Sequence, residues 1–495
     1  MFSSTTGHRL LGTGATATAL TCLAACAYLP NFEDLQPNPP DTQTELVSLA
    51  PEQVRGVETR ELVIEHEGVR TAARYPLIPT AAPLTMEIRT LMAERETQLI
   101  TSGTGGELEQ EATLLAVSDA VVGARIVARG GTAGTTTATT RWYDTASATV
   151  RPWRALLRNE AAITALGARV ARQLRDDYGV SAEELPEDLR EAATVMASPS
   201  NDSFAPPAAA EKQQRASSLH DIGFDTAGNV VIRFSPGQAG TGSVPVDQIT
   251  VERATSDKLL SELGRQAREA AMNGSGTADL STDTVAAAGP AMATLDCDRV
   301  PCVALTFDDG PGPHTQRLLD HLAEHSVDAT FYVLGQLVDG NGETLRRAVR
   351  EGHEIGNHSW QHDDLTTLSP EQVRNDLERT SAAIERAVGA PPRTMRPPYG
   401  AYDATSSANT ALPMIIWDVD TRDWQTRSTA ETVEIATSQT SPGSVVLMHD
   451  IHAPTVAAVP EIITRLRGQG YHFVTVSGLF SETGLKPGAA YKRRT

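Results

Sequence analysis

One short run of residues constrains this chain more than any other. Residues 303–307 are largely apolar, a pattern typical of a strand that is buried on both faces. Asp308 and Asp309 follow directly, and Gly310 and Pro311 end the strand. In parallel α/β sheets and barrels, ligands bind at the carboxyl ends of the strands. These two carboxylates are therefore placed where chemistry usually occurs, although a solvated turn would have the same sequence.

Apolar runs recur after this strand, with helical patterns between them. Helices are predicted over 314–325, 369–388 and 455–466, and the second begins with a capping box at Ser369 and Gln372. Alternation of strands and helices predicts a parallel sheet that closes into a barrel. Seven strands are predicted: 303–307, 329–334, 353–356, 393–396, 414–419, 444–448 and 472–476. About 180 residues is short for a full eightfold barrel. The expected fold is therefore α/β, a distorted or incomplete (β/α)7–8 barrel preceded by a smaller mixed α+β domain.

The later strands also end in polar residues. His358 and His362 are four residues apart, so both can reach one cation from a helical turn. With Asp309 they form a set of two histidines and one carboxylate with open positions for water, which is typical of hydrolytic or oxidative metal sites. The other strand ends carry the sequences Arg396-Pro397-Pro398-Tyr399-Gly400, Asp420-Thr421-Arg422-Asp423-Trp424 and Leu447-Met448-His449.

The ordered set resembles the polysaccharide deacetylase (NodB-homology) domain of carbohydrate esterase family 4, over residues 297–484. The five segments that carry the resemblance are 306–311, 358–362, 396–400, 420–424 and 447–449. The resemblance implies an N-deacetylase, a hydrolase acting on carbon–nitrogen bonds other than peptide bonds. It also implies a divalent metal cation, with zinc favoured, held by Asp309, His358 and His362.

The resemblance and the chemistry assign the same roles to the remaining residues. Asp308 is the expected general base, kept ionised by the charge of Arg396. The backbone N–H of Tyr399 is expected to stabilise the oxyanion. His449, oriented by Asp423, is expected to protonate the departing amine.

Three further residues are expected to contact the substrate. Trp424 and Leu447 would form a small apolar pocket for the acetyl methyl group, and Pro398 belongs to the rigid turn beside it. Plain core packing is the alternative for Trp424 and Leu447, just as a structural ion pair is the alternative for Arg396.

The first 26 residues indicate export. An apolar run from Leu10 to Ala25 is too short to span a bilayer and suits the core of a signal peptide. It ends in Leu23-Ala24-Ala25-Cys26, which resembles the bacterial lipobox, with an ordinary cleaved signal as the alternative. We expect lipidation of Cys26, attachment to the membrane through that anchor, and a location at the outer face of the cytoplasmic membrane or in the cell wall.

Composition divides the rest of the chain. A tether is predicted over 27–58, a mixed α/β spacer or wall-binding domain over 59–266, a flexible linker over 267–296 and a C-terminal tail over 485–495. In an oxidising compartment Cys297 and Cys302 are expected to form a disulfide. Segments at 142–145, 153–157 and 234–246 resemble an extracellular domain shared by some anti-sigma factors and bacterial peptidoglycan deacetylases.

The net charge and the motifs limit the classes of molecule that this protein is expected to bind. The net charge of −20 argues against nucleic acid, which requires Lys and Arg to displace counterions. The expected partner is an N-acetylated polysaccharide of the cell wall, with peptidoglycan favoured, and no protein partner is implied. Chitin oligomers and acetylated xylan remain alternative substrates. A non-catalytic wall-binding or sensing lipoprotein is the alternative from another functional class.

Overall fold

The computed structural model describes residues 45–495, apart from 67, 133, 198–216, 240–245, 274–279, 281–294 and 482. The predicted signal peptide, its lipobox Cys26 and most of the predicted tether and linker lie outside these residues. Among the helices of the described ranges, none combines the length and the apolar character that a membrane crossing needs.

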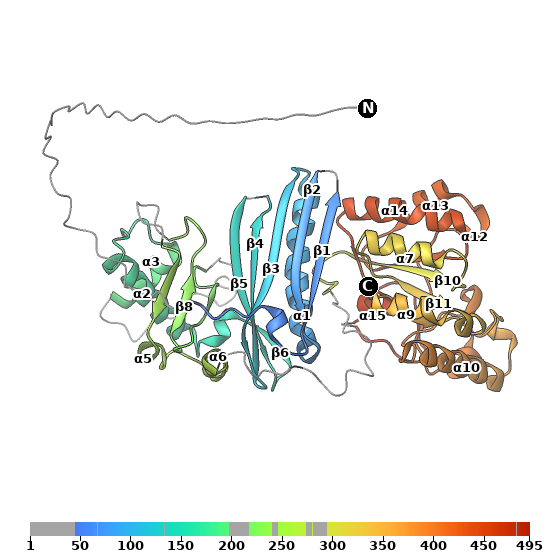
Figure 1. The fold of residues 1–495 in the computed structure, drawn as a ribbon, viewed down its shortest axis with the longest axis horizontal. Coiled ribbons are helices and arrows are strands. Elements are labelled where there is room, and N and C mark those ends of the chain that lie inside the picture. The colour runs from blue at the N-terminus through green and yellow to red at the C-terminus, as the bar shows by residue number, and fades with distance from the viewer. Residues whose placement is uncertain are drawn as a thin grey trace, which may run out of the picture. The chain divides into compact units, whose positions relative to one another are not determined.

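The C-terminal half has parallel strands alternating with helices (Figure 1). Its central sheet has the order β12-β11-β10-β15-β14, and β16 pairs with the beginning of β10. The strands are β10 (Cys302–Asp308), β11 (Thr330–Val333), β12 (Glu354–Asn357), β13 (Met414–Ile415), β14 (Val419–Asp420), β15 (Ser444–His449), β16 (His472–Phe473) and β17 (Ala490–Tyr491). The apolar run 303–307 lies in β10, the central strand of this sheet, and all seven residues of β10 are buried.

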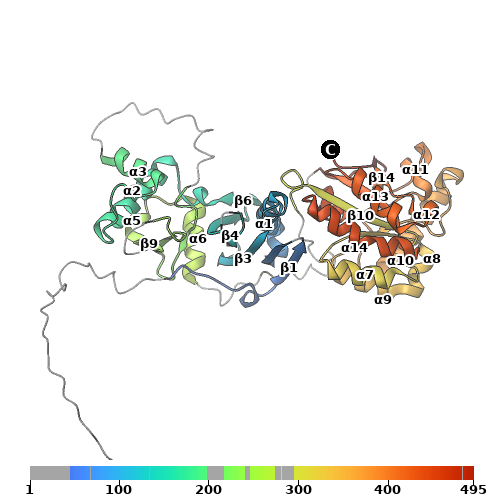
Figure 2. The ribbon, with the colours of Figure 1, turned by 90° about the horizontal axis from the view of Figure 1, so that it is seen from above.

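Helices pack around this sheet (Figure 2). The longer ones are α7 (Thr315–Glu324), α9 (Gly342–Arg350), α10 (Pro370–Val388), α13 (Thr429–Gln439) and α14 (Ala453–Gly468). The three predicted helices are present as α7, α10 and α14. Short helices are α8 (Gly335–Val338), α11 (Ala404–Ala408), α12 (Asp423–Thr426) and α15 (Val476–Leu479). The predicted capping box of α10 is present, since Ser369 accepts the Gln372 N–H and the Gln372 side chain accepts the Ser369 N–H.

The strands form an open sheet rather than a closed barrel in the described residues. Only single bridges join Met395 to Asn357 and to Met414, so the predicted strand 393–396 does not form a regular ladder. The predicted strand 414–419 is divided into β13 and β14. Proline at 397, 398 and 413 removes backbone N–H donors on both sides of these segments, which limits pairing there.

The N-terminal region contains two sheets and is not the smaller part that the sequence predicted. Its larger sheet has the order β1-β2-β3-β4-β5-β6 and packs against α1, while a second sheet has the order β7-β8-β9 (Figure 1). The strands are β1 (Glu58–His66), β2 (Val69–Leu77), β3 (Gly106–Val117), β4 (Val121–Gly130), β5 (Thr135–Asp144), β6 (Thr149–Pro152), β7 (Ile222–Phe224), β8 (Val230–Arg233) and β9 (Gln248–Val251). The helices are α1 (Ala82–Ser102), α2 (Glu160–Asp176), α3 (Glu187–Ala197), α5 (Arg253–Ser256) and α6 (Glu262–Asn273).

Three predicted boundaries shift. Leu46 and Val47 are buried in the core, so the packed region begins inside the predicted tether. Helix α6 continues into the predicted linker, because its alanines at 267, 270 and 271 are good helix formers and pack in the same core. The predicted tail contributes β17, which pairs with β13, and Arg494 is buried. These three segments contain few apolar residues, but they are ordered because they pack against the core or pair with a strand of the neighbouring domain.

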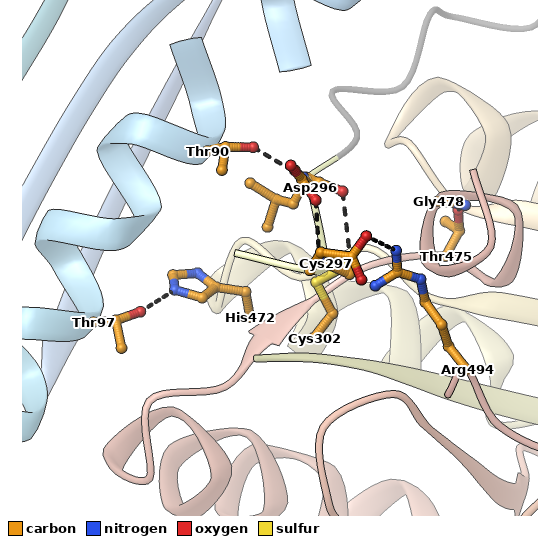
Figure 3. Close-up of a disulfide and its surroundings, with 11 residues drawn as sticks. Thr90, Thr97, Asp296, Cys297, Cys302, His472, Thr475, Gly478 and Arg494 are labelled. Carbon is orange, nitrogen blue, oxygen red and sulfur yellow. Dashed lines mark hydrogen bonds and ion pairs between the residues drawn. A yellow bond between two sulfur atoms is a disulfide. The ribbon is translucent and has the colours of Figure 1, made fainter. Parts of the chain in front are cut away.

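A disulfide joins Cys297 to Cys302 immediately before β10 (Figure 3). Neighbouring contacts hold this loop from two sides. The Asp296 N–H donates to Thr90 of α1 at 2.9 Å, and Asp298 pairs with Arg494 at 3.0 Å. The loop therefore connects α1 to the first strand of the C-terminal half.

Candidate active site

Four strand ends place the predicted site residues at one edge of the sheet. In the parallel register Asp308 lies opposite His449 of β15, and Leu447 lies opposite both Thr306 and Asp420. In the described part of the chain eight non-glycine residues have positive φ, and six of them lie in the loops around this edge: Asp309, Ser359, His362, Tyr399, Arg422 and Arg427. Backbone strain of this kind concentrates at functional sites, where the surrounding packing maintains it.

Asp309, His358 and His362 form the predicted metal-ligating set. Their ligand atoms lie within 4.8 Å of one another. Asp309 Oδ1 is 3.4 Å from His358 Nε2 and 3.3 Å from His362 Nε2. Burial opposes ionisation of Asp309, but the two imidazoles outweigh it and lower its pKa to about 2. The carboxylate is thus ionised, as a metal ligand must be.

Two further observations fit a cation at this position. Asp309 Oδ1 is buried and lacks a hydrogen-bond partner among the described residues. His358 Nδ1 lies 2.7 Å from the backbone oxygen of Arg396, which places the proton on Nδ1 and leaves the Nε2 lone pair directed at Asp309. Burial also lowers the pKa of His362, which favours its neutral, ligating form. The three residues can hold a divalent cation.

Arg396 and Asp308 form a buried ion pair beside this set. Arg396 Nη1 donates to Asp308 Oδ1 and to Thr306 Oγ1, both at 2.7 Å. The other guanidinium nitrogens donate to the backbone oxygens of Ile415 at 3.0 Å and Ile416 at 3.2 Å. Asp308 Oδ2 faces the metal-ligating set, 3.7 Å from His358 Nε2. One carboxylate oxygen is therefore fixed by the arginine while the other faces the place of reaction.

Asp423 and His449 form a second buried pair. His449 Nδ1 is 2.9 Å from Asp423 Oδ1, and the His449 N–H donates to Oδ2 at 2.8 Å. Burial alone would lower the pKa of His449, but the hydrogen bond and charge of Asp423 raise it. Burial would raise the pKa of Asp423, but the bonds from His449 and Thr455 lower it. The pair therefore favours an imidazolium held by a carboxylate, which is the state of a general acid.

The predicted substrate-contacting residues differ in exposure. Trp424 and Tyr399 are 49% and 68% exposed at the rim, which argues against the plain-core alternative for Trp424. The Tyr399 ring lies edge-on to that of His362, with centroids 4.4 Å apart. Leu447 and Pro398 are buried. Two of the four residues are thus exposed aromatic side chains and two are buried apolar ones.

Other residues near the motifs have supporting places. Asp420 accepts the Arg422 N–H, and Asp418 accepts the Val445 N–H and the Ser444 hydroxyl. His353 lies at the opposite end of the strands, His314 precedes α7, and the His452 ring lies 5.9 Å from that of His449. None of His314, His353 and His452 joins the metal-ligating set in the described structure.

Sequence reasoning missed Asp450 and Thr455. Burial raises the pKa of Asp450 to about 7, and its Oδ2 accepts from the Thr315 hydroxyl. A side chain at Gly310 would collide with this carboxyl group, so Asp450 fixes the turn that follows Asp309. Thr455 donates to Asp423 Oδ2 at 2.7 Å. Asp450 directly follows His449, and this position could have marked it as part of the site. Thr455 lies in a helix far from Asp423 in the sequence, so nothing in the sequence indicated their contact.

Comparisons with known proteins identify the family of this chain. A family model described as polysaccharide deacetylase matches residues 296–413. The chain is 37% identical over 189 residues to a chitooligosaccharide deacetylase of Sinorhizobium fredii, covering 34% of this chain and 88% of that protein. The chain belongs to the polysaccharide deacetylase family.

Two other relatives are matched over less than half of their length. The peptidoglycan-N-acetylglucosamine deacetylase PgdA of Listeria monocytogenes is 42% identical over 194 residues, 39% of this chain and 41% of that protein. The peptidoglycan-N-acetylmuramic acid deacetylase PdaC of Bacillus subtilis is 42% identical over 178 residues, 36% and 38% of the two chains. The chain thus spans about two fifths of the length of these two relatives.

Proposed function

We propose that this protein hydrolyses N-acetyl groups of peptidoglycan amino sugars, releasing acetate and a free amine. The observation that carries the proposal is the grouping of three units at one sheet edge. These units are the metal-ligating set around the unpartnered Asp309 oxygen, the Arg396–Asp308 pair and the Asp423–His449 pair. Each unit supplies one requirement of amide hydrolysis.

Asp309, His358 and His362 would hold a divalent cation, for which zinc is the favoured identity given two imidazoles and one carboxylate. Bound there, such a cation lowers the pKa of water and polarises a carbonyl group. Arg396 forms an ion pair with Asp308 and fixes its orientation. Asp308 Oδ2 then takes a proton from the attacking water as the C–O bond forms.

The departing amine needs a proton as the C–N bond breaks. His449 donates it, and Asp423 maintains the protonated ring before that step. The backbone N–H of Tyr399 stabilises the oxyanion. Trp424 and Leu447 enclose the acetyl methyl group, with Pro398 fixing the adjacent turn. In the proposed cycle the water proton goes to Asp308 and the His449 proton goes to the amine.

Peptidoglycan as the substrate rests on two supports. PgdA and PdaC, whose names specify peptidoglycan, are 42% identical to this chain over the matched region. The sequence also favours export, and we propose that Cys26 carries a lipid anchor that keeps the enzyme at the outer face of the membrane beside the wall. In this proposal the N-terminal region acts as a spacer or wall-binding part.

The test is acetate release by the metal-loaded protein from purified peptidoglycan, chitooligosaccharide and acetylated xylan in parallel. Release from peptidoglycan with little from the others supports the proposal. Release mainly from chitooligosaccharide would assign the substrate suggested by the Sinorhizobium relative, and release mainly from xylan would assign an O-acetyl substrate. Absence of both metal binding and release would favour a non-catalytic wall-binding protein.

A further inference from the structure

A cavity of about 250 Å³ lies away from the active site, at the amino ends of the parallel strands. Asp328 and His353 line it just before β11 and β12, and Arg467 lines it from the end of α14. Residues of β1, β2 and α1 form its other wall, among them Arg60 and Arg89. Since a water molecule occupies about 30 Å³ in the liquid, the cavity has room for a small ligand.

The acidic groups in and beside the cavity already have cationic partners. Asp328 pairs with Arg60 at 3.4 Å. The remaining pairs are Glu96 with Arg89 at 3.0 Å, Glu351 with Arg347 at 2.7 Å and Glu61 with Arg74 at 3.2 Å. Each of these carboxylates therefore has an arginine other than Arg467 as its ion-pair partner, and of the four only the Glu96 charge also acts on Arg467, without forming an ion pair with it.

Among the arginines that line the cavity, Arg467 is the one without a carboxylate partner in the described structure. Its residue is 7% exposed, its Nη2 donates to the backbone oxygen of His325 at 2.8 Å, and its guanidinium lies 5.7 Å from the Phe473 ring centroid. It forms no ion pair with any described residue. Burial lowers its pKa to about 10, so it stays charged at neutral pH. A buried charge without a counterion is costly, and proteins normally pair it.

His353 supplies a second unmatched group in the same cavity. It is 4% exposed, and its Nδ1 accepts the Ala329 N–H at 3.1 Å. Burial lowers the pKa of His353 to about 3, so the ring is neutral and its proton is on Nε2. That Nε2–H is buried and finds no acceptor among the described residues. Glu351 Oε2, from another lining residue, is also buried without a hydrogen-bond partner, but the Glu351 charge is paired with Arg347. The net imbalance in the cavity is therefore a positive charge on Arg467 and a hydrogen-bond donor on His353.

We propose that this cavity binds a small oxyanion, a carboxylate or a phosphate, which neutralises Arg467 and accepts the His353 Nε2–H. Water could accept from His353 but would leave the charge of Arg467 unmatched. A cation would meet the three arginines that line the cavity, at 60, 89 and 467. A small oxyanion supplies both the negative charge that Arg467 lacks and the acceptor that His353 lacks, and both residues line this one cavity.

The test is isothermal titration of the full-length protein with inorganic phosphate and, separately, with acetate, against sodium chloride at equal ionic strength. Each titration is run on metal-loaded and on chelator-treated protein. We expect one saturable site per chain with the same Kd in both metal states, and the tighter of the two anions identifies the ligand type. Binding that requires the metal would place the anion at the catalytic site and overturn the proposal.

Variants locate the site. Arg467→Gln should weaken binding by about tenfold or more, because it removes a charge-assisted bond, and Arg467→Lys should restore most of it. His353→Phe, which keeps a ring but removes the donor, should cause a smaller loss. Arg465→Gln is the matched control, because Arg465 lies on the same helix but is half exposed and paired with Glu461 at 2.6 Å. Unchanged binding in Arg467→Gln, or heats equal to those of chloride in the native chain, would overturn the proposal.

Discussion

A buried arginine lies near each end of strand β10, and the two arginines differ in whether their charge has a carboxylate partner. At the carboxyl end Arg396 donates to Asp308, Thr306 and two backbone oxygens, so its charge and its N–H groups are matched. At the amino end Arg467 donates to one backbone oxygen and has no carboxylate partner among the described residues. The unmatched group at the carboxyl end is instead an anion, the Asp309 oxygen.

This difference indicates what each end can bind. An unmatched buried carboxylate beside two imidazoles favours a cation, whereas an unmatched buried guanidinium favours an anion. The backbone strain is also unequal, since Asp309, His362 and Tyr399 have positive φ at the carboxyl end. That end therefore has the properties of a reaction site, and the amino end those of a binding site at a packed joint.

The largest predicted effect is on catalysis. Asp308→Asn removes the base but keeps the size of the side chain, so acetate release should fall by about 10²–10⁴-fold. The metal content, measured by elemental analysis, should stay near that of the native protein because the ligands are unchanged. Asp298→Asn is the control at the other end of the strand, since Asp298 is exposed and pairs only with Arg494. Near-native turnover in Asp308→Asn would remove Asp308 as the base.

Matched substitutions of the two arginines test the comparison itself. Arg396→Met leaves Asp308 as a buried carboxylate without its partner and should reduce the free energy of unfolding by about 3–5 kcal/mol. Arg467→Met removes an unpaired charge, so in buffer without oxyanions it should change that free energy by less than about 1 kcal/mol in either direction. Urea unfolding of both variants measures the difference. Equal losses would show that Arg467 has a counterion after all.

The pH dependence of catalysis tests the Asp423–His449 pair. Because Asp423 raises the pKa of His449, the native acid stays protonated to higher pH, and activity falls as pH rises through that pKa. Asp423→Asn removes the anion and should move this alkaline limb to lower pH by about 1–3 units. The measurement is kcat between pH 5 and 10, with Asp418→Asn as control. An unmoved limb would assign the alkaline pKa to another group.

The sequence predicted the active site better than the architecture around it, for a physical reason. Carboxylates and histidines that follow strands are brought together by any parallel sheet, so the residues from Asp308 to His449 could be placed without knowing how the sheet closes. Weak pairing around Met395 depends on prolines and on β17, whose apolar signal is too short to recognise. Leu46 and Val47 were likewise read as tether because only the folded N-terminal region shows what buries them.

Arg467 and His353 were not predictable as a site for a related reason. Both follow ordinary helix or strand patterns, and only the approach of β1 and α1 turns them into buried, unmatched groups. Residues at the carboxyl ends of strands carry a positional signal in the sequence. Residues whose environment depends on contact with a distant part of the chain carry no such signal in the sequence.

The smallest predicted effect concerns the disulfide at the amino end. Replacing Cys297 and Cys302 by serine opens a loop of only a few residues, so the free energy of unfolding should fall by about 2 kcal/mol. Free-thiol titration of the native, unreduced protein should find neither thiol. Because the loop contacts Thr90 and Arg494 rather than the active site, the double serine variant should keep its metal content and its acetate release. A loss of metal in that variant would show that a change at the amino end of β10 alters the metal site at its carboxyl end.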